Sequence, residues 1–120
     1  MMSGLGVFAQ VYINNIAQAF KQGDAKALSA YFDQTVDLTF SEETNTYSKK
    51  HAEQILHKFF AKIEPQDFTQ RSGDSKYNKS KYSIGILKSS KGTYKVYLFF
   101  IYRGEKGYLR ELRFEKQYLN

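Results

Sequence analysis

The sequence predicts an α+β fold in which three helices pack on a curved, mainly antiparallel sheet. In the first part of the chain and again around residues 48–63, apolar residues recur every three or four positions, as in amphipathic helices. From about Asp67 onward, apolar residues mostly alternate with polar ones, as in strands with one buried face. Short glycine-containing segments separate the later strands, and such segments are typical of antiparallel hairpins.

Two helices are expected to open the domain. The first covers about Val7 to Gln22 and buries one apolar stripe. Gly23 suits its C-terminal end because glycine adopts the left-handed conformation at little cost. Asp24 can cap the second helix. A strand with one buried face is expected over Thr35 to Ser41, and the polar residues Glu42 to Asn45 are expected to form a turn.

The third helix is expected to begin after Ser48, its N-cap, and to end before Pro65, the only proline. Four strands should follow and form a meander, because the connections between the last three are short. Their approximate bounds are Asp67 to Ser72, Lys79 to Ser89, Thr93 to Arg103 and Tyr108 to Gln117.

The strand Thr93 to Arg103 differs from its neighbours because residues 96–102 are apolar without alternation. A strand that is apolar on both faces is usually covered on both faces. One face can pack on the helices, and the other must meet a partner subunit or a curled part of the same sheet. A homodimer joined through the sheet is favoured. Its predicted interface residues are Tyr97, Phe99 and Ile101.

Length and composition narrow the range of functions. A chain of 120 residues fits a single domain that spans residues 1–120. Disulfides, thiolate metal sites and a cysteine nucleophile are excluded because there is no cysteine. No apolar run approaches the ~20 residues of a membrane-spanning helix, so no transmembrane segment is expected.

Positive charge is concentrated in the second part of the chain. Two basic residues stand against five acidic ones through Ser48, whereas sixteen stand against seven from Lys49 onward. Most of the later lysines fall at turns or alternate along strands, which disfavours a nucleic-acid groove. A basic surface for anionic polymers stays an alternative. No acidic residue lies between Asp74 and Glu105. The basic residues of that segment are Lys76, Lys79, Lys81, Lys88, Lys91, Lys95 and Arg103.

The amino terminus has two interpretations. Val7-Phe8-Ala9 has the small-residue spacing of a signal-peptidase site, but the basic and long apolar segments that should precede such a site are missing. Residues 1–9 are therefore either the remnant of a truncated signal peptide or the start of the first helix, and the residues leave both interpretations open.

The order of helix, helix, strand, helix and four-stranded meander resembles the nuclear transport factor 2-like, or cystatin-like, superfamily, whose curved sheet forms a cone around the first helix. The segments GDAKALSAYF, VDLTF, YSKKHAEQILHKFF, GTYKVYLFF and YLRELRFEK resemble a small bacterial family of uncharacterised secreted domains within it. This resemblance implies an extracytoplasmic domain, periplasmic or secreted. It selects no function, because such folds host isomerases, dehydratases, transport adaptors and ligand binders.

Candidate catalytic groups are few. Asp37 lies between two apolar residues and is expected to face solvent, and Asp33 is expected to cap or end the second helix. His51 and His57 fall on opposite flanks of the third helix, so they cannot readily share a metal. A non-enzymatic domain without cofactor or metal is favoured. An isomerase or dehydratase that uses an inward acid or histidine is the alternative.

Arg110 is the most informative charge because it shares the strand parity of Leu112 and Phe114, which are expected to be buried. It lies either at the open mouth of the cone or within it as an anion receptor. A small-ligand or interaction module with an aromatic pocket is therefore predicted, unless the chain's own Phe and Tyr side chains fill the cone. The tyrosines expected around Arg110 are Tyr12, Tyr31, Tyr82 and Tyr97.

Overall fold

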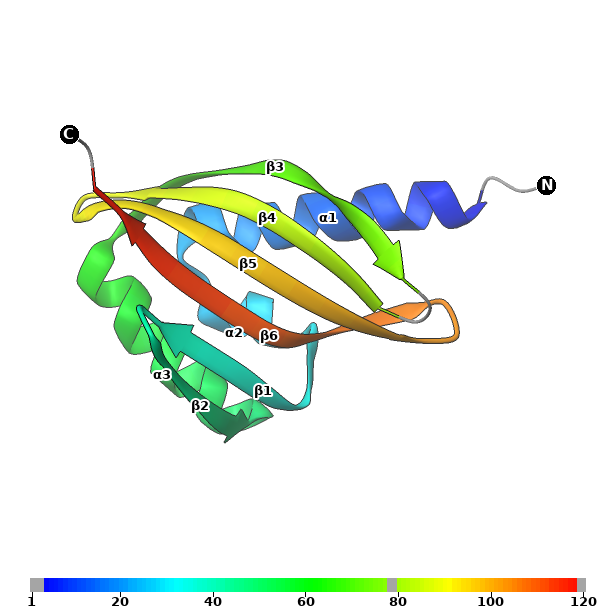
Figure 1. Cartoon of the computed structure of the whole chain (residues 1–120), viewed down its shortest axis with the longest axis horizontal. Coiled ribbons are helices and arrows are strands. Elements are labelled where there is room, and N and C mark those ends of the chain that lie inside the picture. Colours follow the sequence, from blue (N-terminus) through cyan, green and yellow to red (C-terminus); the bar gives the residue numbers. More distant parts are fainter. Residues whose placement is uncertain (1–3, 78–79, 119–120) are drawn as a thin grey trace.

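The computed structural model describes the backbone of residues 4–77 and 80–118 and the side chains of residues 13–71 and 80–118. Three helices lie on one face of a six-stranded sheet (Figure 1), so the predicted α+β class is confirmed. The helices are α1 (Gly4–Gln22), α2 (Ala25–Ser29) and α3 (Lys49–Ile63). The strands are β1 (Phe32–Phe40), β2 (Glu43–Ser48), β3 (Pro65–Tyr77), β4 (Ser80–Ser89), β5 (Gly92–Arg103) and β6 (Lys106–Gln117).

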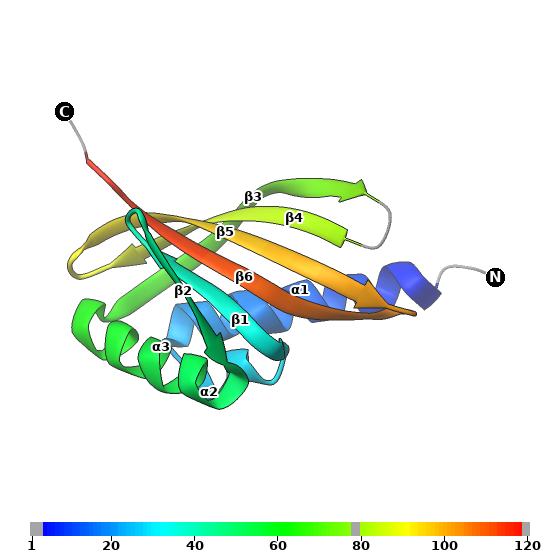
Figure 2. The ribbon, with the colours of Figure 1, turned by 60° about the horizontal axis from the view of Figure 1, so that its bottom comes forward.

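The sheet is mixed but mostly antiparallel, with the strand order β2-β1-β6-β5-β4-β3. Only β1 and β6 pair in parallel, while the other four neighbouring pairs are antiparallel. The strands twist and bend above the helices (Figure 2). The long β3 to β6 meander covers α1, and the short β1 to β2 hairpin lies beside α3 (Figures 1 and 2).

The helix caps predicted from the sequence are confirmed. The Ala27 backbone N–H donates to Asp24 Oδ1 at 3.0 Å, and the His51 N–H donates to Ser48 Oγ at 3.2 Å. Gly23 has a φ of 64°, which is the left-handed conformation expected at that helix end. Pro65 begins β3 directly after α3.

The expected turn at Glu42 to Asn45 is wrong, because β2 begins at Glu43 and the turn is shorter. Polar contacts join β1 and β2: the Thr39 and Thr44 hydroxyls lie 2.7 Å apart, and the Thr46 hydroxyl donates to Asp37 Oδ1 at 2.6 Å. β2 is exposed except for Tyr47, which is partly buried. It therefore lacks the apolar alternation by which a strand is recognised.

Aromatic rings from four elements pack in the core between the helices and the sheet. Phe20 of α1 lies with its ring centroid 6.1 Å from that of Phe60 in α3 and 6.3 Å from that of Phe114 in β6. All three are at most 2% exposed. The Phe68 ring stacks on Phe20 at 4.5 Å. These edge and stacked geometries are the preferred ones for aromatic pairs, so this cluster fixes α1 and α3 against the sheet.

β6 contains an extra residue, and this changes which side chains face outward. Phe100 of β5 pairs with Leu109, but its neighbour Phe99 pairs with Glu111, so Arg110 is the residue without a partner in the register. Leu109 and Leu112 are both fully buried although they are three positions apart. The expectation that Arg110 shares the inward parity of Leu112 is therefore wrong, because the bulge reverses the parity between them.

β5 is apolar on both faces, as predicted. Val96, Leu98 and Phe100 are buried against the helices, while Tyr97 and Phe99 lie partly exposed on the opposite face. Among the described elements no helix covers that outer face (Figures 1 and 2). In the described part of the chain, this face has contacts between side chains of neighbouring strands, such as Tyr82 with Phe99, but no helix covers it.

We predict that Gly85→Ala destabilises the fold. A Cβ at this position would lie 2.2 Å from the Phe68 ring, and that ring cannot move freely because it stacks on Phe20. The expected loss is about 1–3 kcal/mol in the free energy of unfolding, measured by urea denaturation.

The control is the double variant Gly85→Ala with Phe68→Leu. It should lose less stability than the sum of the two single variants, because the smaller side chain leaves room for the methyl group. An unchanged urea midpoint in Gly85→Ala alone would contradict this account of the contact.

Candidate functional site

A buried carboxylate that bonds two arginines forms the most distinctive polar cluster. Asp33 is 6% exposed and lies near the start of β1. Arg103 donates to both of its oxygens, from Nη1 to Oδ1 at 3.0 Å and from Nη2 to Oδ2 at 3.2 Å. Arg110 Nη1 donates to Oδ2 at 3.4 Å, and the Gln34 backbone N–H donates to Oδ1 at 2.9 Å. The carboxylate thus accepts four hydrogen bonds.

These contacts keep Asp33 ionised. The hydrogen bonds from Arg103 hold the pKa of Asp33 below its ordinary value, against the opposite effect of burial, and the Gln34 N–H and the nearby positive charges act in the same direction as Arg103. The expectation that Asp33 caps or ends the second helix is wrong. That helix ends at Ser29 with Ala30 as its C-cap, so Asp33 is in the following strand.

The two arginines line an open cleft of about 570 Å³. We call it the Asp33 cleft. Lys49, the first residue of α3, and Tyr108 of β6 also line it. The Arg103 guanidinium carbon lies 5.0 Å from the centre of the Tyr108 ring, within the range of a cation–π contact. The full lining is Phe32, Asp33, Gln34, Thr35, Lys49, Arg103, Tyr108 and Arg110.

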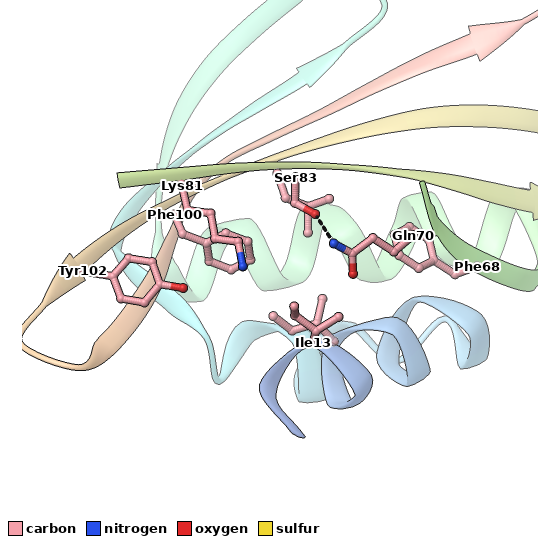
Figure 3. A pocket seen from close by; sticks show the side chains of 9 residues that line it. Ile13, Phe68, Gln70, Lys81, Ser83, Phe100 and Tyr102 are labelled. Atoms are coloured by element: carbon pink, nitrogen blue, oxygen red, sulfur yellow. Dashed lines mark hydrogen bonds between the residues drawn. The ribbon is translucent and has the colours of Figure 1, made fainter. Parts of the chain in front are cut away.

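The side chains drawn in Figure 3 border a small space between α1 and the sheet. Its volume of about 20 Å³ is enough for roughly one water molecule. Apolar and polar side chains line this space. Among the polar ones, the Gln70 amide donates to Ser83 Oγ at 2.9 Å. Lys81 and Tyr102 also border this space (Figure 3). The volume agrees with the sequence-based alternative in which the chain's own side chains fill the interior.

Six large apolar side chains form a patch on the outer face of β4 and β5, which we call the outer strip. Tyr82 pairs with Phe99 across the two strands, with ring centroids 4.8 Å apart. Tyr82 is 47% exposed. The register places the members on adjacent rungs of the ladder. They are Tyr82, Ile84, Ile86, Tyr97, Phe99 and Ile101.

The structure does not bring together the residues predicted to surround one ligand. Arg110 lies in the Asp33 cleft, while Tyr82 and Tyr97 belong to the outer strip. Tyr31 packs partly buried against the core, and its carbonyl accepts a hydrogen bond from the Leu109 N–H at 2.6 Å. The side chain of Tyr12 lies outside the described residues.

Sequence reasoning missed Asp33, Lys49, Arg103 and Tyr108 as neighbours of Arg110. Asp33 and Arg103 are 70 positions apart, so only the folded sheet brings them together. One sequence signal was available: the apolar residues Leu109 and Leu112 are three apart inside a strand. This spacing fits a bulge, whereas an uninterrupted strand alternates with a period of two.

The other candidate groups are spread over the surface. Both histidines of α3 are exposed, and the His51 ring contacts the Tyr47 ring edge-on at 4.9 Å. Across the side chains at 13–71 and 80–118, no three His, Asp or Glu residues are placed to share a metal ion. Asp37 is partly exposed and accepts the Thr46 hydrogen bond described above.

The lysine-rich stretch does not form one continuous surface in the described residues. Lys81 borders the interior space, whereas Lys88 and Lys91 are exposed on β4 and in the turn after it. Lys95 lies 5.2 Å from the centre of the Tyr97 ring. Lys79 and the Lys76 side chain fall outside the described residues. In the part of the chain that is described, none of the helices combines the length and apolar content needed to cross a bilayer.

This arrangement, with three helices on one face of a mixed sheet, defines the class of cystatin-like or nuclear transport factor 2-like α+β domains. Over residues 13–115 the sequence matches the family described as a domain of unknown function, DUF4783. The chain belongs to that family. The resemblance seen in the sequence segments is thereby confirmed, including the absence of an assigned function. Curated proteins give no match.

Solved structures support the same class. A DUF4783 family protein from Bacteroides ovatus is similar, with 25% identity, a TM-score of 0.83, and coverage of 88% of this chain and 94% of that chain. A domain of unknown function with a cystatin-like fold from Nostoc punctiforme shares 8% identity at a TM-score of 0.74, over 99% and 81% of the two chains. "Rd1NTF2_04 with long sheet" shares 10% identity at 0.71, over 88% and 98%. The last two likenesses concern the fold alone.

We predict that Asp33→Asn lowers stability in a pH-dependent way. Because the pKa of Asp33 is lower in the folded chain than its ordinary value of 3.8, its ionised form stabilises the fold above that value. This stabilisation is lost as the pH falls through the folded pKa. The expected loss in the free energy of unfolding is about 1 kcal/mol at pH 7. This loss is small for hydrogen bonds between charged groups because both arginines are substantially exposed.

Thermal or urea unfolding from pH 7 down to pH 2 measures this difference. The gap between wild type and Asp33→Asn should be constant near neutrality and should shrink below about pH 4. Asp37→Asn, a change at a partly exposed carboxylate of the same strand, is the control. A gap that does not change with pH would show that the Asp33 charge contributes nothing.

Proposed function

We propose that this chain is a non-enzymatic interaction module that works as a homodimer, joined through the outer strip. The observation that carries the proposal is the exposure of this strip on the sheet face opposite the helices, with Tyr82 47% exposed. Burying apolar surface is worth about 25 cal/mol per Å². Contiguous apolar patches on a folded domain commonly mark contact surfaces.

The charges beside the strip favour a second copy of this chain as the partner. A two-fold interface brings one patch against itself, so a patch of a single sign would be repelled. Here both signs alternate: Glu115 of β6 pairs with Lys95, and Glu111 pairs with Phe99. Arg113 lies between the two acids, with its guanidinium carbon 5.7 Å from the centre of the Tyr97 ring. Such a mixed surface can be complementary to itself.

The non-enzymatic part of the proposal rests on the carboxylates and histidines. Asp33 is ionised and accepts four hydrogen bonds, and its lowered pKa makes it a poor general base at neutral pH. An isomerase-type site needs an inward acid or histidine. The polar side chains described around the interior space are instead Gln70, Lys81, Ser83 and Tyr102.

We predict that Tyr82→Glu converts the dimer to a monomer. The change places a negative charge in the centre of the strip, where a two-fold contact would bring two such charges together without water. Because nearly half of Tyr82 is exposed, its replacement should leave the fold intact. Sedimentation equilibrium at micromolar concentration gives the mass.

The matched control is Tyr118→Glu, which makes the same chemical change at a tyrosine that is 80% exposed and lies outside the strip. It should stay dimeric. A monomeric wild type, or equal dissociation of both variants, would refute self-association through this face.

The proposal includes an extracytoplasmic location. It is supported by the small-residue spacing at Val7 to Ala9. We predict that cell fractionation recovers the native protein outside the cytoplasm, with a mature N-terminus near Gln10 by mass spectrometry. Recovery in the cytoplasm with Met1 intact would contradict this prediction.

A further inference from the structure

We propose that the Asp33 cleft binds a doubly charged oxyanion, such as the phosphate group of a small soluble ligand. This goes beyond self-association, because the cleft is lined by residues other than those of the outer strip. Four observations carry the proposal: the charge balance of the cleft, the bonds that position the Arg103 donors, the additional cation at the start of α3, and the size of the cleft.

The cleft has more positive charge than its own carboxylate can neutralise. Its ionised lining residues are Lys49, Arg103 and Arg110 against Asp33, three positive charges against one negative. A purely structural ion pair needs one arginine for one carboxylate. The additional arginine and lysine leave an excess of positive charge in the lining of one cleft, and a bound anion would reduce that excess. An anion of charge −2 balances the remaining charge, whereas a single negative charge does not.

The Arg103 donors are positioned before any ligand arrives. The bidentate bonds from Arg103 to Asp33 fix the plane of that guanidinium, and the Tyr108 ring packs 5.0 Å from it. Each terminal nitrogen of a guanidinium carries two hydrogens, and a single bond to Asp33 engages one of them. Fixing long side chains in advance lowers the entropy cost of binding, so Asp33 acts as the positioning residue of the site.

The start of α3 adds a third cation to the cleft, and β1 adds the neutral side chain of Thr35. Lys49 is the first residue of α3, a helix of 15 residues, and the N-terminal end of a helix carries partial positive charge. Thr35 pairs with Ser48 next to it and also lines the cleft. A ligand in the cleft would meet Arg103, Arg110 and Lys49, which all line it.

The size of the cleft indicates that the oxyanion is one part of a larger ligand. A volume of about 570 Å³ falls within the range of small-molecule sites, roughly 300–1,000 Å³. Tyr108, which is partly exposed, provides aromatic surface within the same lining. The charged group would contact the cations while the remainder of the ligand packs on this ring.

The test is an NMR titration of the full chain with sodium sulfate and inorganic phosphate, with acetate as the singly charged comparison, all at one fixed ionic strength. The amide resonances of Gln34, Thr35 and Lys49 should shift with sulfate and phosphate and should saturate. Acetate should bind more weakly. Arg110→Gln and Lys49→Ala should each weaken sulfate binding about tenfold, as expected for the loss of one charge-assisted hydrogen bond.

The matched control is Lys50→Ala, which removes the same charge one residue along α3 and lines the outer surface of that helix. It should bind sulfate as wild type does. Equal weakening by Lys50→Ala, equal binding of acetate, or shifts that do not saturate would overturn the proposal. Lys49→Ala changes an exposed residue, so it keeps the test decisive if Arg110→Gln misfolds. All these variants leave the outer strip intact. Sulfate binding therefore tests the cleft, and the mass of the same variants by sedimentation tests the proposed dimer separately.

Discussion

Burial of Leu109, Leu112 and Phe114 from one strand is the constraint on which the outer surface depends. A regular strand turns alternate side chains to opposite faces, so residues 109 and 112 cannot both face the core without an interruption. The extra residue at Arg110 supplies that interruption. All three apolar side chains are then buried, and the guanidinium of Arg110 reaches the carboxylate of Asp33. Core packing in β6 therefore determines where the cleft forms.

The aromatic core explains why the candidate sites lie outside the space between α1 and the sheet. Phe20, Phe60 and Phe114 pack edge to face, and Phe68 stacks on Phe20. The described interior is left with about 20 Å³, compared with about 570 Å³ in the Asp33 cleft. A domain that fills its interior with its own rings gains stability from their burial. The small volume of the described interior space therefore favours ligand binding on the outer faces.

Local features were predictable from the sequence, and features that depend on strand pairing were not. Asp24 and Ser48 were identified as caps because a cap acts within three residues of itself. The strand β5, which is apolar on both faces, was recognisable from its unbroken run of apolar residues. β2 was missed because it is an edge strand, pairs only with β1 and has almost no buried side chain.

In the candidate site, too, the single residue Arg110 was predictable from the sequence, whereas its neighbours depend on strand pairing. Arg110 was singled out as a residue at the mouth of the cone or an anion receptor within it, but its parity was wrong because a regular alternation was assumed across the bulge. Its partners Asp33 and Arg103 come from β1 and β5, on either side of β6 in the sheet. Only the parallel pairing of β1 with β6 brings that carboxylate next to both arginines.

The outer strip and the cleft meet at one pair of residues, which connects the two proposals physically. Ile101 of the strip pairs with Tyr108 of the cleft, and Arg103 lies two positions beyond Ile101 on the same face. A second copy seated on the strip would exclude water near this pair. Charges interact more strongly when water is excluded, so the attraction of Arg103 and Arg110 for an oxyanion would increase. Self-association would in that case strengthen ligand binding without adding a new contact to the ligand.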